Sequence, residues 1–273
     1  MNLENYFISL FNNRHIGDDA ALIDGYVYSK DAFFENVHFK REWMNYYQIA
    51  KKAMLVNISD AIAMNAKPLY ALLSVAMPKS MSKKDMNALA DGFKHVAKCY
   101  NIEIIGGDTI SNTKLDITIT IISRTKEPLF RKGIRKNHLF AYTGELGKSA
   151  KDLKRLFNLG KIHSRSKFID IQLRDKFIQN TTRFLKSGMD VSDGLFSDLQ
   201  KLTKLNNIGV KFIEKIPKSI IGCSGEEYEM LIAFDTRDRK AVQRRAYQSR
   251  TRVNIFAKAS RNRYINRCKA HHF

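Results

Sequence analysis

Patterns typical of β-strands alternate with patterns typical of α-helices along almost the whole chain of 273 residues. A helical pattern over Met44 to Ala66 is closed by Pro68 and followed by the apolar strand pattern LYALLSVAM. Later, LDITITII alternates polar and apolar residues, and a helical pattern over 195–205 precedes the strand pattern GVKFI. Chains that interleave strands and helices bury sheets under helices, so the predicted fold class is α/β or α+β. Further helices are predicted over 2–11, 82–100, 148–159, 170–186 and 237–248, and a hairpin turn at Asp24-Gly25. Ser82, with Asp85 three residues later, resembles the N-cap of the helix over 82–100.

The length of the chain favours two domains over one. The basic, glycine-containing segment RKGIRKNH separates two halves that each interleave strands and helices. We therefore expect an N-terminal domain over 1–136 and a C-terminal domain over 137–273. The two halves share acidic motifs, but we find no clear sequence repeat between them.

The charge of the chain is strongly positive, with 47 Lys and Arg against 27 Asp and Glu and a formal net charge of +20. Much of the excess lies in 237–269, where Arg residues alternate with apolar residues. A basic nucleic-acid-binding protein is therefore one alternative function. No signature of a known nucleic-acid-binding module accompanies the basic stretch, so nucleic acid is not the expected partner.

The compartment follows from what the chain lacks. No apolar run approaches the roughly 18 residues of a membrane-spanning helix, and MNLENYFISLFNN does not have the pattern of a signal peptide. We therefore expect a cytoplasmic protein without a membrane span. The cysteines Cys99, Cys223 and Cys268 are odd in number and far apart, so we expect no disulfide framework, and we expect Cys99 to be buried.

Five short segments place an aspartate beside glycine, serine or a second aspartate, where small neighbours let a ligand approach the backbone. If these acids converge, their repulsion has to be offset by cations. Mg²⁺ takes oxygen ligands and commonly binds one or two carboxylates together with substrate phosphates. The pattern therefore predicts several Mg²⁺ ions and a polyphosphate. The segments are GDDAAL, SKDAFFENVHF, NISDAIAMNA, GGDTIS and DVSDGL.

Other nucleotide-binding patterns are missing from the sequence. There is no GxxxxGK[ST] phosphate loop, no GxGxxG fingerprint and no protein-kinase signature. A nucleotide would therefore be held by metal–carboxylate contacts and by the backbone.

The order of the motifs resembles that of the thiamine-monophosphate kinase family, in the superfamily that also contains aminoimidazole ribonucleotide synthetase and selenophosphate synthetase. The family has GDDAA, an S-T-D segment ending in V-H-F, N-L-S-D-x-x-A-M-x-A-x-P, GGDT, D-x-S-D-G-L and GGEDYEL. This chain has GDDAA, SKD…NVHF, NISDAIAMNAKP, GGDT, DVSDGL and SGEEYEM in the same order over residues 17–231. Each motif is weak alone, whereas the ordered set is specific.

The resemblance implies a fold, an activity and partners. The fold would comprise two α/β domains, with the N-terminal one forming a homodimer across a β-sheet and binding nucleotide near that interface. The activity would be Mg²⁺-dependent transfer of the γ-phosphoryl group of ATP to thiamine monophosphate, which gives thiamine diphosphate and ADP. Because the accepting phosphate oxygen is already anionic, we assign no general base.

The resemblance also implies roles for individual residues. Gly107, Ser192 and Arg131 would contact ATP, with Arg131 stabilising charge during transfer, and His38 and Glu226 would contact the substrate. A packed ring for His38 and the start of a strand for Glu226 remain structural alternatives. The metal positions would be Asp19, Ser29, Lys30, Asp31, Asp60, Asp108, Asp190 and Asp193.

The chain departs from the family pattern at several points. Lys30 stands where the family has threonine. The change is harmless if the metal uses only the backbone carbonyl, and otherwise one metal position is lost. SGEEYEM replaces GGEDYEL. The family's aromatic residue that stacks on thiamine could correspond to Arg267 or Tyr264 in the tail.

Sister enzymes remain the second alternative. A selenophosphate synthetase would need a reactive cysteine near the N-terminus, but no cysteine precedes Cys99. The hydrogenase-maturation relative ends in cysteine, whereas residues follow Cys268 here. The motif order fits aminoimidazole ribonucleotide synthetase less well.

Overall fold

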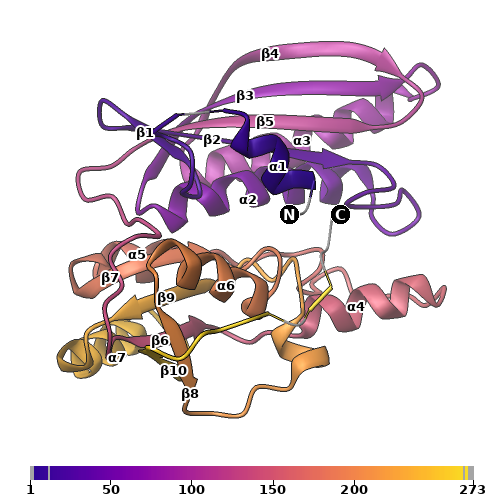
Figure 1. Ribbon diagram of the computed structural model, residues 1–273. Helices are drawn as coiled ribbons and strands as arrows, with labels where there is room; N and C mark the ends of the chain where they lie inside the picture. Colours follow the sequence, from indigo (N-terminus) through magenta and orange to yellow (C-terminus); the bar gives the residue numbers. More distant parts are fainter. Residues whose placement is uncertain (1–2, 12, 267, 270–273) are drawn as a thin grey trace.

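The computed structural model describes residues 3–11, 13–266 and 268–269 and contains two five-stranded sheets, one from each half of the chain (Figure 1). The first sheet has the order β1-β2-β5-β3-β4, in which β3 and β4 are parallel and the other neighbours are antiparallel. Its strands are β1 (Ala21–Ile23), β2 (Tyr26–Phe34), β3 (Lys67–Pro78), β4 (Glu103–Asn112) and β5 (Asp116–Arg124).

The second sheet is antiparallel and has the order β7-β9-β6-β10-β8. The chain passes from the first sheet to the second between Arg124 and Leu139. The predicted boundary at residue 136 falls in this connection and stays a prediction. The strands are β6 (Leu139–Thr143), β7 (Leu185–Asp190), β8 (Gly209–Phe212), β9 (Met230–Phe234) and β10 (Val253–Ser260).

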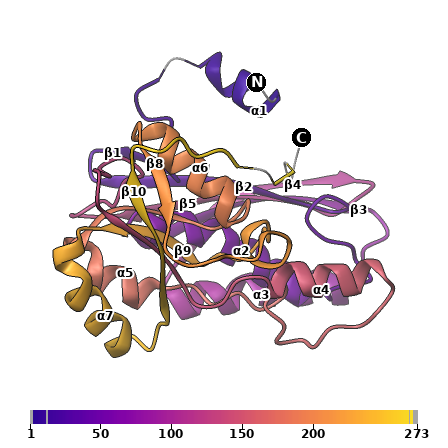
Figure 2. The same ribbon diagram turned by 60° about the horizontal axis from the view of Figure 1, so that its bottom comes forward.

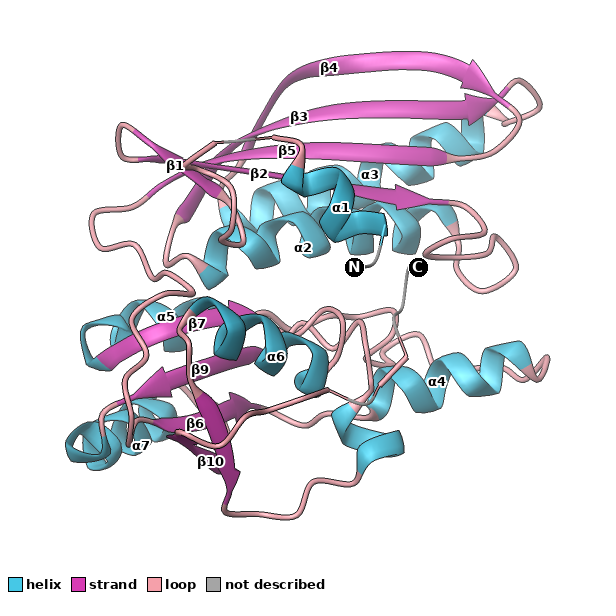
Figure 3. Cartoon of the chain, viewed as in Figure 1, coloured by secondary structure: helices cyan, strands magenta, loops and turns pink. Residues whose placement is uncertain are grey.

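Helix α2 (Tyr46–Ala63) lies between the two halves, where it packs on β2 and β5 of the first sheet and on β7 of the second (Figures 1 and 3). It begins at a capping box in which Asn45 and Gln48 bond each other's backbone. Most of its side chains are buried, including Lys52 and Asn57. A helix covered on both sides is apolar nearly all round, which explains the long apolar stretch of this segment.

Helix α3 (Lys83–Tyr100) packs beside α2 and covers the same face of the first sheet. The side chain of Ser82 caps it by accepting a hydrogen bond from the Asp85 backbone, as the sequence predicts. Figure 2 shows α1 (Leu3–Ser9) apart from both sheets. The remaining helices are α4 (Lys148–Phe157), α5 (Asp175–Thr181), α6 (Leu195–Leu205) and α7 (Arg239–Gln248).

The predicted elements are present, with corrections in the second half. The hairpin turn at Asp24-Gly25 is confirmed, since both residues have positive φ as a two-residue hairpin turn of this type requires. The helix predicted over 170–186 is wrong in extent: α5 is short, and strand β7 begins at Leu185 and ends at Asp190. This strand is buried on both faces, so its sequence LKSGMD lacks the alternation by which a strand is recognised.

The cysteine predictions are wrong on two counts. Cys223 and Cys268 form a disulfide that ties the loop before β9 to the C-terminal tail. The two cysteines are 45 residues apart in the sequence, and the tertiary fold brings them together. Cys99 is exposed, because it lies on the outer side of α3.

Candidate active site

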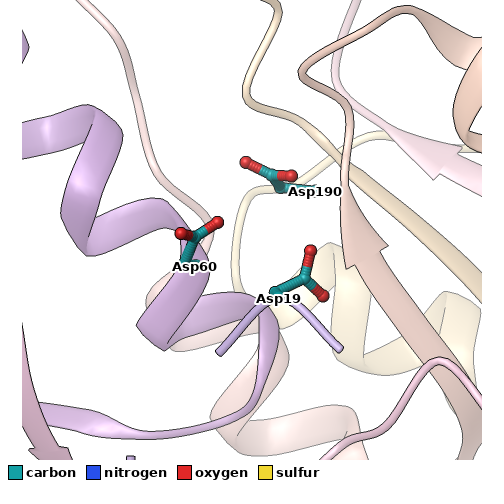
Figure 4. Close-up of side chains that lie close together, drawn as sticks. All are labelled: Asp19, Asp60 and Asp190. Atoms are coloured by element: carbon teal, nitrogen blue, oxygen red, sulfur yellow. The ribbon is translucent and has the colours of Figure 1, made fainter. Parts of the chain in front are cut away.

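Three aspartates from distant parts of the chain converge where the two halves meet (Figure 4). Asp19 lies in the loop before β1, Asp60 lies in α2, and Asp190 is the last residue of β7. One carboxylate oxygen of each lies within 4.8 Å of those of the other two. These three residues, called the carboxylate cluster below, confirm that acids from both halves share one place.

Few donors hold the carboxylate cluster together. Arg131 donates to Asp19 Oδ1 at 2.7 Å, and the Ser59 hydroxyl donates to Asp190 Oδ2 at 2.8 Å. Among the described residues, no other cation forms an ion pair with these three carboxylates. The Oδ2 atom of Asp19 is buried and has no hydrogen-bond partner. Uncompensated, converging carboxylate oxygens form a donor set that fits a hard divalent cation.

The electrostatics of the site oppose ionisation of these acids in the protein alone. Burial, and next the charge of Asp19, raise the pKa of Asp190 to about 8. Burial also raises the pKa of Asp60, and the neighbouring Asp31 and Asp190 raise it further. A bound cation would reverse this effect, since it favours the charged carboxylates.

Ser29 and Asp31 lie on the face of β2 that is turned toward α2. The Asp31 backbone donates to Asn57 Oδ1 at 2.7 Å, and the Ser29 hydroxyl donates to the Asn57 carbonyl at 3.1 Å. Burial and the charge of Asp19 raise the pKa of Asp31 to about 6, which places its carboxylate in the field of the carboxylate cluster. Sequence reasoning assigned no role to Asn57, although it lies inside the NISD motif.

Lys30 and Asp108 occupy the opposite, outward face of the first sheet. Lys30 is exposed and donates to Thr118 Oγ1 at 3.3 Å, so its cation points away from the acids of the site. The register runs from Ala32 through Thr118 and Ser74 to Asp108, which is exposed on the edge strand β4. Strands β2 and β4 are therefore three strand spacings apart, which corresponds to roughly 14 Å. A single chain therefore does not bring Asp108 to the carboxylate cluster.

Asp193 and Ser192 lie in the turn after β7. Asp193 pairs with Lys201 at 2.6 Å, and Lys201 also pairs with the buried Asp198 at 2.9 Å. The Ser192 carbonyl accepts a hydrogen bond from the Glu226 backbone at 2.7 Å. Sequence reasoning missed Asp198, whose pKa burial raises to about 6, because its place in the first turn of α6 is equally typical of a helix N-terminus.

His38 packs on the aromatic ring of Phe33, whereas Glu226 lies beside the buried Lys52. The His38 ring stacks on Phe33 at 5.6 Å between centroids, and its Nδ1 accepts a hydrogen bond from the Phe34 backbone at 3.0 Å. Glu226 pairs with Lys52 at 2.6 Å. Sequence reasoning missed Lys52, although a lysine inside the apolar run of α2 was a usable signal.

Gly107 lies at a cleft between α3 and the strands β3 and β4. The cleft has a volume of about 410 Å³, is lined mainly by apolar side chains such as Leu73 and Phe93, and has Asp108 at its edge. A Cβ atom at Gly107 would lie 1.6 Å from the Leu73 carbonyl oxygen, and φ is +148°. Glycine is therefore required for β4 to approach β3 here.

The tail was expected to supply the residue that stacks on thiamine. Tyr264 packs on Phe212 at 6.0 Å between ring centroids and donates to the Phe196 carbonyl at 3.1 Å. Arg267 lies outside the described residues, so the choice between the two stays open.

Comparison with known proteins identifies the fold class to which this chain belongs. Residues 17–125 match the family described as AIR synthase related protein, N-terminal domain. AaThiL complexed with AMPPCP and TMP has a similar fold, with a TM-score of 0.85 at 20% identity over 97% of this chain and 91% of that chain. The protein therefore has an AIR synthase related fold that holds a cluster of carboxylates between its two halves.

Sequence relatives define the family within that class. The thiamine-monophosphate kinase of Bacillus subtilis (strain 168) is 31% identical over 223 residues, which are 74% of this chain and 67% of that protein. The thiamine-monophosphate kinase of Buchnera aphidicola subsp. Schizaphis graminum (strain Sg) is 31% identical over 260 residues, 84% of this chain and 79% of that protein. The chain belongs to the thiamine-monophosphate kinase family. In the part that the structure describes, none of the helices has the length and apolar character needed to cross a membrane.

Proposed function

We propose that this protein transfers the γ-phosphoryl group of ATP to the phosphate of thiamine monophosphate, giving thiamine diphosphate and ADP. The observation that carries the proposal is the convergence of Asp19, Asp60 and Asp190 in a chain of this family. AaThiL, which shares the fold, was complexed with AMPPCP and TMP, and this supports the same pair of ligands here. Because ATP is the co-substrate, the proposal places the enzyme in the cytoplasm.

The residues of the carboxylate cluster, with Asp31 and Ser29 beside them, would hold Mg²⁺. When bound, Mg²⁺ would neutralise charge on the phosphate oxygens during transfer. Arg131, which already pairs with Asp19, would add a guanidinium to the same end of the site. Asp193 and the backbone of Lys30 remain proposed ligands.

The nucleotide would lie near the cleft beside Gly107, whose apolar lining suits an adenine ring. Ser192 would contact the phosphates from the turn after β7. His38 and Glu226 would contact thiamine monophosphate, whose phosphate oxygen attacks without a general base.

We also infer that the protein is a homodimer that joins the outward faces of two first sheets. Large apolar side chains are exposed there, namely Tyr28, Tyr70, Leu72 and Ile110. Asp108 lies on this same face, so a second subunit would cover it. Sedimentation should give a dimer for the wild type and a monomer for Leu72→Asp. The control Leu159→Asp, at a residue 96% exposed in the other half, should leave the dimer intact, and a wild-type monomer would refute the inference.

The decisive experiment measures ADP release with ATP, thiamine monophosphate and Mg²⁺, leaving out one component at a time. We expect ADP only when all three are present, with thiamine diphosphate formed in equal amount. ADP release without thiamine monophosphate, or none under any condition, would contradict the proposal. Salt-dependent RNA binding without ADP release would favour the nucleic-acid alternative.

A further inference from the structure

Lys52 is a lysine whose side chain is fully buried in the middle of α2. Its ammonium group forms an ion pair with Glu226 Oε2 at 2.6 Å and lies 3.6 Å from the centroid of the Phe168 ring. An isolated charge in such a place would be costly, so a buried lysine is retained only with a partner. Burial lowers the pKa of Lys52, and the Glu226 carboxylate opposes that shift.

The ion pair joins the two halves of the protein at the proposed substrate end of the site. Lys52 belongs to the helix that also carries Asp60, whereas Glu226 belongs to the loop before β9. Glu226 is held in the left-handed region with φ of +53°, by a backbone hydrogen bond to Ser192 and another from the Ser149 hydroxyl. These backbone contacts fix the loop, but within the described residues the carboxylate has Lys52 as its ion-pair partner.

Aromatic rings and one carboxylate surround the Lys52 ammonium group. It lies 5.7 Å from the centroid of the Phe33 ring, in addition to its contacts with Phe168 and Glu226. The Glu226 side chain is 26% exposed, so it remains open to a ligand while Lys52 is completely covered.

We propose that Lys52 is a positioning residue that orients the Glu226 carboxylate for binding thiamine monophosphate. The inference rests on the proposed function and adds to it a residue that does not touch the substrate. Loss of the lysine would leave the carboxylate free to rotate toward solvent, and the binding geometry would be lost. Among the described residues Lys52 forms no ion pair with Asp19, Asp60 or Asp190, so the contribution of ATP and of the carboxylate cluster to turnover should change little.

The test compares Lys52→Met with Lys51→Met, a matched control one residue away. Lys51 also joins α2 to the other half, through an ion pair with Asp170 at 2.6 Å, but it does not contact Glu226. We expect Lys52→Met to raise the KM for thiamine monophosphate roughly tenfold or more, with kcat and the KM for ATP within about twofold. Lys51→Met should leave all three constants near those of the wild type.

A second comparison separates positioning from general stabilisation. If Lys52 acts through Glu226, the double variant Lys52→Met/Glu226→Gln should have the same KM for thiamine monophosphate as Glu226→Gln alone. The double variant removes both charges of the ion pair together, so it can still be measured even if Lys52→Met alone does not fold. An unchanged KM in Lys52→Met, or a further rise in the double variant over Glu226→Gln, overturns the inference. A wild type without ADP release would instead refute the proposed function.

Discussion

The protein buries two groups of acids that differ in how their charge is balanced. In the carboxylate cluster, Asp19 alone has an ion-pair partner among the described residues, Arg131, and burial raises the pKa of Asp190 to about 8. In the second half, the Nε and Nη2 atoms of Arg174 each donate a hydrogen bond to Glu229 at 2.7 Å, and Lys167 pairs with the same carboxylate at 3.0 Å. Burial there is outweighed by Arg174 and Lys167, so the pKa of Glu229 is lowered.

The difference in charge compensation distinguishes buried acids with a structural role from buried acids that bind a ligand. Both Glu229 oxygens accept hydrogen bonds from within the chain, from Arg174, Lys167 and the Thr143 hydroxyl. Lys167 also lies 3.0 Å from Glu227 Oε2, so this neighbouring buried carboxylate has a cation beside it although Oε2 accepts no hydrogen bond. The carboxylate cluster keeps an unpartnered oxygen on Asp19. A fold retains such an imbalance where a cation is supplied from outside, which is the proposed role of Mg²⁺.

The largest expected effect is on catalysis. Asp190→Asn should lower the rate of ADP formation by on the order of 10³-fold, because it removes a charged ligand at the reacting phosphates. The same change should raise the Tm of the metal-free protein at neutral pH, since burial and the charge of Asp19 both oppose the ionised carboxylate, whereas an amide is neutral without taking up a proton. Asp91→Asn, at an exposed position of α3, serves as the control and should change neither quantity. Near-normal turnover in Asp190→Asn would contradict the proposed role of Asp190 as a metal ligand.

The next effect is on stability and concerns the balanced group. Arg174→Met leaves Glu229 buried without its bidentate partner and should lower the free energy of unfolding by about 3–5 kcal/mol. Denaturant unfolding measures this change, and turnover below the new Tm should stay within a fewfold of wild type. Arg237→Met removes an exposed ion pair with Asp235 and should have no measurable effect. An equally stable Arg174→Met would break the contrast between the two groups.

The smallest expected effect is on pH dependence. The native pKa of Asp190 is about 8 against an ordinary 3.8, so its protonated form favours folding. This contribution is complete below the ordinary pKa and is lost as pH rises through the native one. The lowered pKa of Glu229 has the opposite sign, since its contribution exists above 4.5 and is lost on acidification.

Thermal unfolding from about pH 5 to about pH 8 tests this sign in metal-free protein. The Tm of the wild type should fall more steeply with pH than that of Asp190→Asn. Added Mg²⁺ should raise the wild-type Tm most at the alkaline end, where the carboxylates are charged, and should do so less in the variant. Parallel curves for the two proteins would show that Asp190 does not titrate as inferred.

Local patterns account for most of the fold prediction. Alternation in LDITITII, the cap at Ser82 and the turn at Asp24-Gly25 depend on neighbours in sequence, and the structure confirms all three. Strand β7 was not predicted because burial on both faces removes the alternation. The Cys223–Cys268 disulfide was not predicted because no local pattern records contacts across 45 residues.

The candidate site also has features that local sequence predicts and features that depend on tertiary packing. The sequence by itself determined which residue types could bind a polyphosphate with cations, because small residues beside aspartates are a local property, and the order of its motifs predicted the family. Only the tertiary structure decided that Asp19, Asp60 and Asp190 meet, whereas Asp108 lies on the other face of the first sheet. It also decided that Lys52 faces Glu226, a residue 174 positions away. Such pairings depend on how α2 packs between the halves, and sequence spacing carries no measure of that packing.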